Sequence, residues 1–184
     1  MESPWIGPRN IEHSRDIIEL WERLISTEGY SDAYAILNEA INVFREALNC
    51  YQNGAYLATC LLCRTVIESA VYLALTRNIE GKKRIEVNLN YINAKWGRIE
   101  KEARRKGLLG SKEITIINKI RELGNIGAHY AQKVDEILIK NISERENRKG
   151  VIKIWPDRED ALKKLKNTVL ILQIIIRKVH KKLT

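Results

Sequence analysis

The segment 120–130 (IRELGNIGAHY) contains the residues whose types and spacing best suit chemistry. At about 100° per residue on a straight helix, Asn125 lies about 40° and His129 about 80° round from Arg121, so the three follow one line. A histidine exchanges protons near neutral pH and an arginine is a permanent cation, so such a pair suits proton transfer beside an anionic group. Alternatively, His129 is a capping residue near a helix end or an interface residue.

The rest of the chain is organised around the apolar stretch 54–75. It contains two charged residues, Arg64 and Glu68, and its apolar side chains leave no polar face, which is typical of a fully buried helix. These two residues stand four positions apart on one side of the helix, so we expect a structural ion pair in the core, with Arg121 as a candidate third member. The stretch could span a bilayer by length, but a mid-helix ion pair is costly there, so we expect no membrane contact.

A basic face is predicted on the helix at 88–106. Formal charge is uneven along the chain, at −3 over residues 1–92 and +12 over residues 93–184. This face either contacts the phosphates of a nucleic acid or is a solvated surface, of the kind that heat-stable proteins carry. Its cations are Lys95, Arg98, Lys101, Arg104, Arg105 and Lys106.

The remaining pattern predicts an all-α fold, a four- to five-helix antiparallel bundle. Apolar residues at three-four spacing predict helices at 11–26 and at about 32–51, the second capped by Ser31 or Asp32. A further helix is expected from Lys112, and Asp157 should cap a long last helix. Residues 134–156 fit either a small hairpin or a helical extension. We therefore expect an N-terminal arm at 1–10 and a single domain at 11–184, and the apparent lack of a signal peptide favours a cytoplasmic protein.

Neither a metal nor a cofactor is expected. Cys60 and Cys63 form a CxxC inside the apolar stretch, without a second Cys or His pair nearby, which indicates buried, inert thiols. The sequence contains no P-loop, Rossmann fingerprint, zinc-finger spacing or Ser-His-Asp arrangement.

Two motifs in order, GAYLATCLLCRTVIESA and IRELGNIGAH, resemble a domain of unknown function that occurs alone or fused to restriction and phage-defence proteins. That family is grouped with the HEPN superfamily of small helical bundles. The resemblance covers roughly residues 32–130 and, less clearly, the last helix from Asp160. The matching positions are Gly54, Ala55, Arg64, Glu68, Arg121, Gly124, Asn125, Ala128 and His129.

The resemblance implies a helical bundle that is commonly dimeric and, in active members, cuts RNA without metal. Carried over, His129 would be the acid–base group, Arg121 its electrostatic partner and Asn125 a polar orienter. Active members separate the Arg and the His by four to six residues, whereas seven intervene here. Their Tyr, when present, comes two residues after the His, whereas Tyr130 follows it directly.

These observations lead to three hypotheses about function. The first is a binding module of a nucleic-acid-related or defence system without its own catalysis, with RNA or another nucleic acid as ligand. The second is a metal-independent ribonuclease that uses Arg121 and His129, and the third is a homodimeric scaffold with no nucleic-acid role. We expect a homodimer, because the last helix carries a wide apolar band that includes Leu170, Ile171, Ile174 and Ile175.

Overall fold

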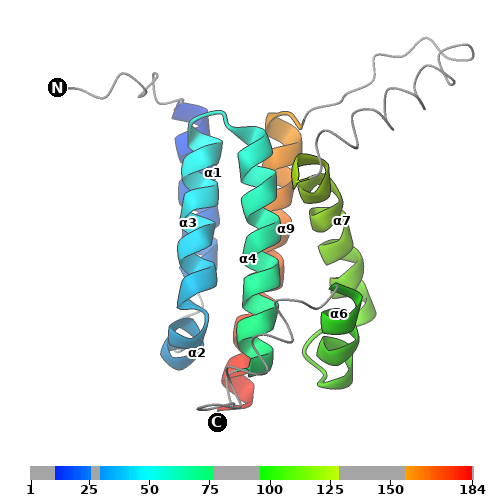
Figure 1. Ribbon diagram of the computed structural model, residues 1–184. Helices are drawn as coiled ribbons and strands as arrows, with labels where there is room; N and C mark the ends of the chain where they lie inside the picture. The colour runs from blue at the N-terminus through cyan, green and yellow to red at the C-terminus, as the bar shows by residue number, and fades with distance from the viewer. Residues whose placement is uncertain (1–10, 26–29, 77–95, 129–155, 184) are drawn as a thin grey trace, which may run out of the picture.

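The helices of this chain stand side by side in a bundle (Figure 1). The computed structural model describes residues 11–25, 30–76, 96–128 and 156–183, and within these ranges every regular element is an α-helix. The all-α prediction is therefore confirmed, while the arm at 1–10 and the alternatives for 134–156 lie outside the described residues. The helices are α1 (Ile11–Ile25), α2 (Ser31–Ile36), α3 (Asn38–Gln52), α4 (Tyr56–Thr76), α6 (Trp96–Arg105), α7 (Ser111–Ala128) and α9 (Arg158–Lys181).

Helix α4 is the centre of the bundle, as its composition predicts. It packs against α3, α7 and α9, and it lies between α3 and α7 in Figure 1. Ten of its residues are buried, among them Cys60, Val66 and Ala70 at zero exposure, whereas Thr65 is exposed, so one side of the helix reaches the surface instead of being buried as predicted. In the part of the chain that the structure describes, α4 is the one helix long and apolar enough to cross a membrane, and here it packs inside the bundle.

A tight turn joins α3 to α4 and makes the two helices antiparallel. Gly54 adopts a φ of 74°, a left-handed conformation that favours glycine, and the backbone N–H of Ala55 donates to the carbonyl of Cys50 at 2.8 Å.

The predicted helix at 32–51 is divided near Leu37. Leu37 is fully buried, and its φ and ψ of −98° and 9° separate α2 from α3. The predicted cap is wrong, because α2 begins at Ser31 and the residue before it, Tyr30, makes no side-chain capping bond. Instead the backbone carbonyl of Tyr30 accepts from the N–H of Tyr34 at 2.9 Å.

The segment 106–110 (KGLLG) connects α6 to α7. Gly107 has a φ of 67°, and the N–H of Leu108 donates to the carbonyl of Ala103 at 2.8 Å, which closes the end of α6. Leu108 and Leu109 are buried, so the connection is held in the core. Helix α7 starts one residue before the predicted Lys112, and a Glu113 carboxylate oxygen accepts from the N–H of Gly110 at 2.7 Å.

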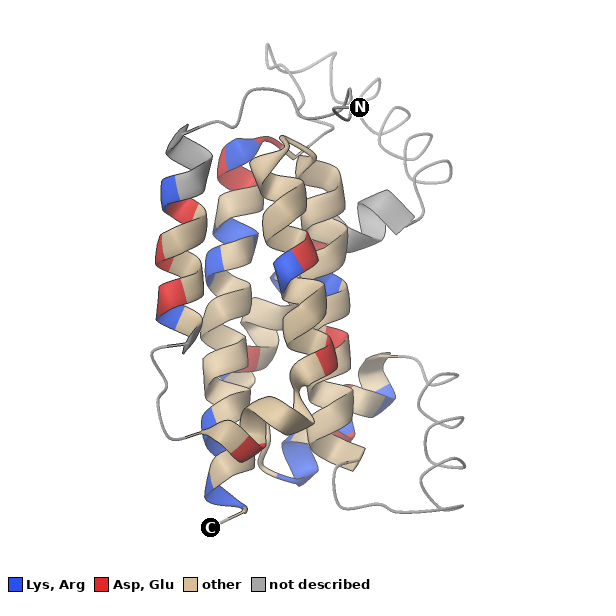
Figure 2. Ribbon diagram, turned by 90° about the vertical axis from the view of Figure 1, so that its left-hand side faces the viewer, with Lys and Arg blue, Asp and Glu red and all other residues tan. Residues whose placement is uncertain are grey.

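The last helix begins as predicted, with Asp157 as its cap. Its carboxylate accepts from the backbone N–H of Asp160 at 3.0 Å, and the Asp160 carboxylate accepts in return from the N–H of Asp157. Lys178, His180 and Lys181 lie in the last turn, where cations complement the helix dipole, and Figure 2 shows basic residues at this C-terminal end.

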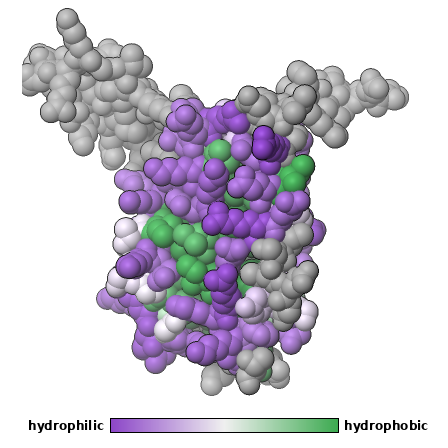
Figure 3. Space-filling view, turned by 180° about the vertical axis from the view of Figure 1, so that it is seen from behind, coloured by the Kyte–Doolittle hydropathy of each residue, from purple (hydrophilic) through white to green (hydrophobic). Residues whose placement is uncertain are grey.

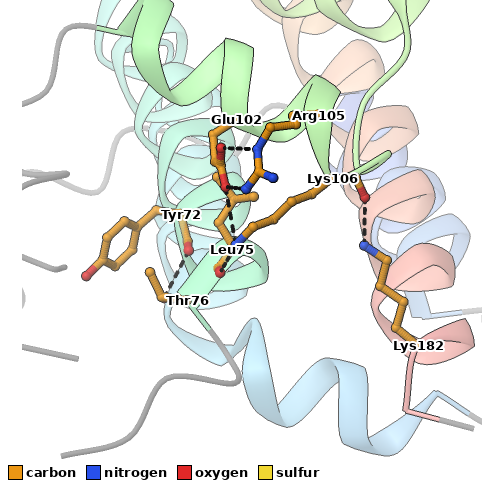
Figure 4. Close-up of polar contacts among 7 residues, drawn as sticks. All are labelled: Tyr72, Leu75, Thr76, Glu102, Arg105, Lys106 and Lys182. Atoms are coloured by element: carbon orange, nitrogen blue, oxygen red, sulfur yellow. Dashed lines mark hydrogen bonds and ion pairs between the residues drawn. The ribbon is translucent and has the colours of Figure 1, made fainter. Parts of the chain in front are cut away.

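Two lysines connect the ends of three helices at the base of the bundle (Figure 4). Lys106 Nζ lies 3.4 Å from the carbonyl of Leu75 near the end of α4 and 3.5 Å from the Glu102 carboxylate. Lys182 Nζ, just after α9, donates to the carbonyl of Lys106 at 2.9 Å. These ammonium groups therefore satisfy carbonyls that helix ends leave without intrahelical partners.

Candidate functional site

Helices α4 and α7 bring two arginines to one carboxylate oxygen. Glu68 Oε1 accepts from Arg64 Nε at 2.9 Å and from Arg121 Nε at 2.7 Å. We call these three residues the arginine cluster. Arg64 and Glu68 lie one turn apart on α4, whereas Arg121 comes from α7, so the cluster exists only when the two helices pack together.

The arginine cluster lies at the edge of the core. The side chains of Arg64, Glu68 and Arg121 retain 23%, 31% and 17% of their exposure. Both arginines use only Nε toward Glu68, and their terminal guanidinium nitrogens make no hydrogen bond to any residue that the structure describes. The cluster therefore carries a net positive charge, with hydrogen-bond donors left for a ligand.

Trp96, the first described residue of α6, fixes the orientation of Arg121. The Arg121 Cζ atom lies 4.6 Å from the centroid of the Trp96 ring, within the range of a cation–π contact. The sequence spacing between Trp96 and Arg121 does not predict this contact, because it arises from the packing of two helices.

A shallow hollow of about 450 Å³, open to solvent over most of its boundary, lies beside Arg121 on α7. We call it the α7 hollow; its described lining residues are Thr115, Asn118, Lys119, Arg121 and Glu122. Helical geometry places Asn118 and Glu122 in the sector of Arg121, but it does not predict a concave surface there. Lys119 and Glu122 are both exposed and three positions apart, yet among the described residues neither makes an ion pair or a side-chain hydrogen bond.

The predicted basic face of α6 contains cations that form ion pairs with neighbouring glutamates and cations that have no described carboxylate partner. Arg104 pairs with Glu100 at 3.1 Å, and Arg105 makes two hydrogen bonds to Glu102 at 2.7 and 2.9 Å. Those bonds from Arg105 hold the pKa of Glu102 down at about 2. Of the three other cations on the described part of this face, Lys106 lies 3.5 Å from the Glu102 carboxylate, whereas Arg98 and Lys101 are exposed and pair with no described carboxylate. Lys95 lies outside the described residues.

Asn125, another candidate catalytic residue, belongs to the last part of α7. The helix continues through Asn125 to Ala128, which places the Asn125 backbone one turn beyond Arg121. His129 lies outside the described residues, so the structure brings together Arg121 and Glu68 without placing the histidine.

The thiols of α4 are buried, as predicted. Burial raises the pKa of Cys60 to about 11 and that of Cys63 to about 12, so both remain protonated at neutral pH. Nearby, the largely buried Lys164 donates to the carbonyl of Lys119, and burial lowers the pKa of its ammonium group. No group of His, Cys, Asp or Glu side chains suited to a metal ion occurs among the described residues.

Comparison with known families gives one match. The model described as "Domain of unknown function (DUF4145)" matches residues 45–145, more than half of the chain. The matched range contains α4, α6 and α7, and with them the arginine cluster and the α7 hollow. No curated protein and no solved structure matches the chain.

Proposed function

Because the chain belongs to this DUF4145 family, whose description assigns no activity, we propose a function from the geometry of the arginine cluster: the protein is an RNA-binding helical module. The observation that carries the proposal is the sharing of Glu68 by two arginines through their Nε atoms alone. The terminal nitrogens that remain are donors suited to the oxygens of a phosphate group.

The surroundings of the arginine cluster favour a polyanion. The described parts of α6, α7 and α9 and the short segments beside them carry sixteen Lys and Arg residues against seven Asp and Glu residues, whereas α1–α4 carry four against eight. Arg121 belongs to α7, one of the helices with this positive balance, and it contacts Trp96 of α6. Arg98 and Lys101 on the neighbouring α6 are available for further phosphate contacts.

The HEPN resemblance supports the choice of RNA and of a defence-related role. The resemblance is carried by one motif on α4 and another on α7. Arg64, Glu68 and Arg121 come from those two motifs and meet in the arginine cluster. We infer a HEPN-type module whose RNA contact depends on Arg121.

Binding of a fluorescently labelled single-stranded RNA, measured by anisotropy over a salt series, tests the proposal. Arg121→Lys keeps the charge but removes the fork of donors, and we expect an affinity roughly tenfold lower. Unchanged affinity for the Arg121→Lys protein, with a normal circular dichroism spectrum, would exclude the arginine cluster as the binding site.

Helix α6 provides a matched pair of charge variants. The double variant Arg98→Ala/Lys101→Ala removes two unpaired cations and should reduce the log–log salt dependence by about two units. Arg104→Ala/Arg105→Ala removes the same formal charge from residues already paired with Glu100 and Glu102, so its effect on the salt dependence should be smaller. Equal effects would show that net charge alone governs binding.

A second candidate function is metal-independent RNA cleavage by Arg121 and His129. It is supported by the fixed orientation of Arg121, whose Nε is bonded to Glu68 and whose guanidinium lies over Trp96. A preorganised cation of this kind is suited to stabilise charge that develops on a phosphate during cleavage. Its test is given in the Discussion.

A further inference from the structure

The two arginines of the arginine cluster are held close enough together to bind one ligand group. Arg64 Nε and Arg121 Nε lie 2.9 and 2.7 Å from the same atom, Glu68 Oε1. The two Nε atoms are therefore no further apart than these two hydrogen bonds together. Since the terminal nitrogens of both arginines bond to no described residue, a phosphate group between the two side chains can accept from both of them.

The arginine cluster is recessed at the junction of three helices. Its side chains, from α4 and α7, retain only 17% to 31% exposure, and the Trp96 ring of α6 lies against the Arg121 guanidinium. An internal phosphate of RNA is esterified on both sides, so both neighbouring nucleotides would have to fit against these helices. A phosphate at the end of a chain is esterified on one side only, so it enters such a recess with less obstruction.

The chemistry of a terminal phosphate also suits two arginines better than that of an internal one. A phosphomonoester presents three terminal oxygens and carries about −1.5 to −2 charges at pH 7. An internal phosphodiester presents two such oxygens and one negative charge. Two guanidinium groups, each with terminal N–H donors in a planar fork, can bond to all three oxygens of the monoester. The cluster's net positive charge then favours the more highly charged group.

We propose that the arginine cluster binds the terminal phosphate of an RNA strand in preference to its internal phosphates. The terminal nitrogens of Arg64 and Arg121 donate to the phosphate, while their Nε atoms stay bonded to Glu68. This rests on the proposed RNA-binding function and specifies which phosphate the two arginines hold. A 5′-phosphate and a 3′-phosphate present the same chemistry, so the experiment includes both.

The test uses single-stranded RNA octamers of one sequence with an internal fluorescent label and different ends. One octamer carries a 5′-phosphate, one carries a 3′-phosphate, and one has hydroxyl groups at both ends. In anisotropy titrations at one fixed salt concentration, we expect at least one phosphorylated octamer to bind about tenfold more tightly than the hydroxyl-ended one. Conversion of that phosphate to its methyl ester removes one charge and one free oxygen, and it should remove most of the gain.

Two variants separate recognition of the end from general binding of phosphates. Arg64→Lys keeps the positive charge but removes the fork of donors, so it should reduce the preference for the phosphorylated octamer. Arg98→Ala/Lys101→Ala removes exposed cations of α6 outside the cluster, so it should weaken all octamers by a similar factor and keep the preference. Circular dichroism and urea midpoints verify that both proteins are folded.

The possible failures are distinguishable. If the wild-type protein binds phosphorylated and hydroxyl-ended octamers equally, or if folded Arg64→Lys keeps the full preference, the assignment of the terminal phosphate to the arginine cluster is wrong while RNA binding stands. If the wild-type protein binds none of the octamers at low salt, the proposed function fails and the preference for an end fails with it.

Discussion

Glu68 on α4 accepts a 2.7 Å hydrogen bond from Arg121 Nε on α7, across 53 positions of sequence. The same oxygen, Oε1, accepts from Arg64 Nε within α4 at 2.9 Å. One carboxylate thus joins two helices and holds the arginine on which the proposed RNA contact depends. Four further predictions concern this ion pair, the buried lysine, the surface of α9 and catalysis.

Removal of the Glu68 carboxylate should destabilise the fold. Glu68→Ala leaves two guanidinium groups without their shared acceptor, and we expect a loss of about 1–3 kcal/mol in unfolding free energy. The loss stays below that of a fully buried ion pair because all three side chains are partly exposed. Urea denaturation measures it, with Glu102→Ala as control, since Glu102 forms its ion pairs within or next to one helix. Equal midpoints for the two variants would contradict the bridging role of Glu68.

Replacement of the buried lysine should stabilise the protein at neutral pH. Lys164 retains 8% exposure and forms no ion pair with a described carboxylate, and burial lowers the pKa of its ammonium group. The pKa of Lys164 is thus lower in the folded protein than the value of about 10.4 in the unfolded chain. Burial of the charged ammonium group therefore reduces the free energy of unfolding at pH values below about 10.4. Lys164→Met should therefore raise the urea midpoint at pH 7, and this gain should diminish as pH approaches about 10. A variant less stable than wild type at pH 7 would show that the bond to the Lys119 carbonyl outweighs the cost of burial.

The predicted homodimer would use a smaller part of α9 than the sequence indicates. Ile171 and Ile175 are fully buried within the protein's own core, whereas Leu170 is 37% exposed and Ile174 is partly exposed. Figure 3 shows an area of hydrophobic surface on the rear of the bundle. Leu170→Glu should convert a dimer to a 21.3 kDa monomer in sedimentation, while Lys166→Glu, one turn earlier on the exposed side, should not. A wild-type monomer at micromolar concentration would refute the dimer.

RNA cleavage, if His129 is the base, should persist in EDTA and leave a 2′,3′-cyclic phosphate. The neutral imidazole is the active form of a general base, so the rate should rise with pH through the usual histidine pKa of about 6.5. His129→Ala and Arg121→Ala should each abolish cleavage, and His180→Ala should leave it unchanged, because His180 packs on Tyr30 at the end of α9. Activity that survives His129→Ala would exclude this active site.

The sequence predicts the central helix and its ion pair because both signals are local. A largely apolar surface on 54–75 indicates a central, mostly buried helix, although Thr65 is exposed, and two charges four positions apart must share one side of the helix. Arg121 is also named as a candidate third member of this ion pair, and its Nε donates to Glu68.

Other features depend on information that apolar periodicity does not carry. The cations of α6 indicate a basic face, but Arg104 and Arg105 form ion pairs with Glu100 and Glu102, which lie four and three positions earlier. These pairs are predicted only when the acidic residues of the helix are considered together with its cations. The break between α2 and α3 at Leu37 leaves the periodic spacing of apolar residues intact, because Leu37 is itself buried in the core. The spacing therefore does not predict the break. The contact of Trp96 with Arg121 depends on how α6 and α7 pack, which no single helix specifies.

The sharing of one Glu68 oxygen by two arginines also restricts which substitutions this chain can accept during evolution. A substitution at Glu68 alone leaves like charges facing each other, and a substitution at one arginine leaves the other to neutralise the carboxylate completely. Changes at the three positions are therefore coupled. In diverging copies of this chain, Arg64, Glu68 and Arg121 should be kept together or replaced together, and a copy that has exchanged all three for apolar residues should keep the bundle and lose the RNA contact.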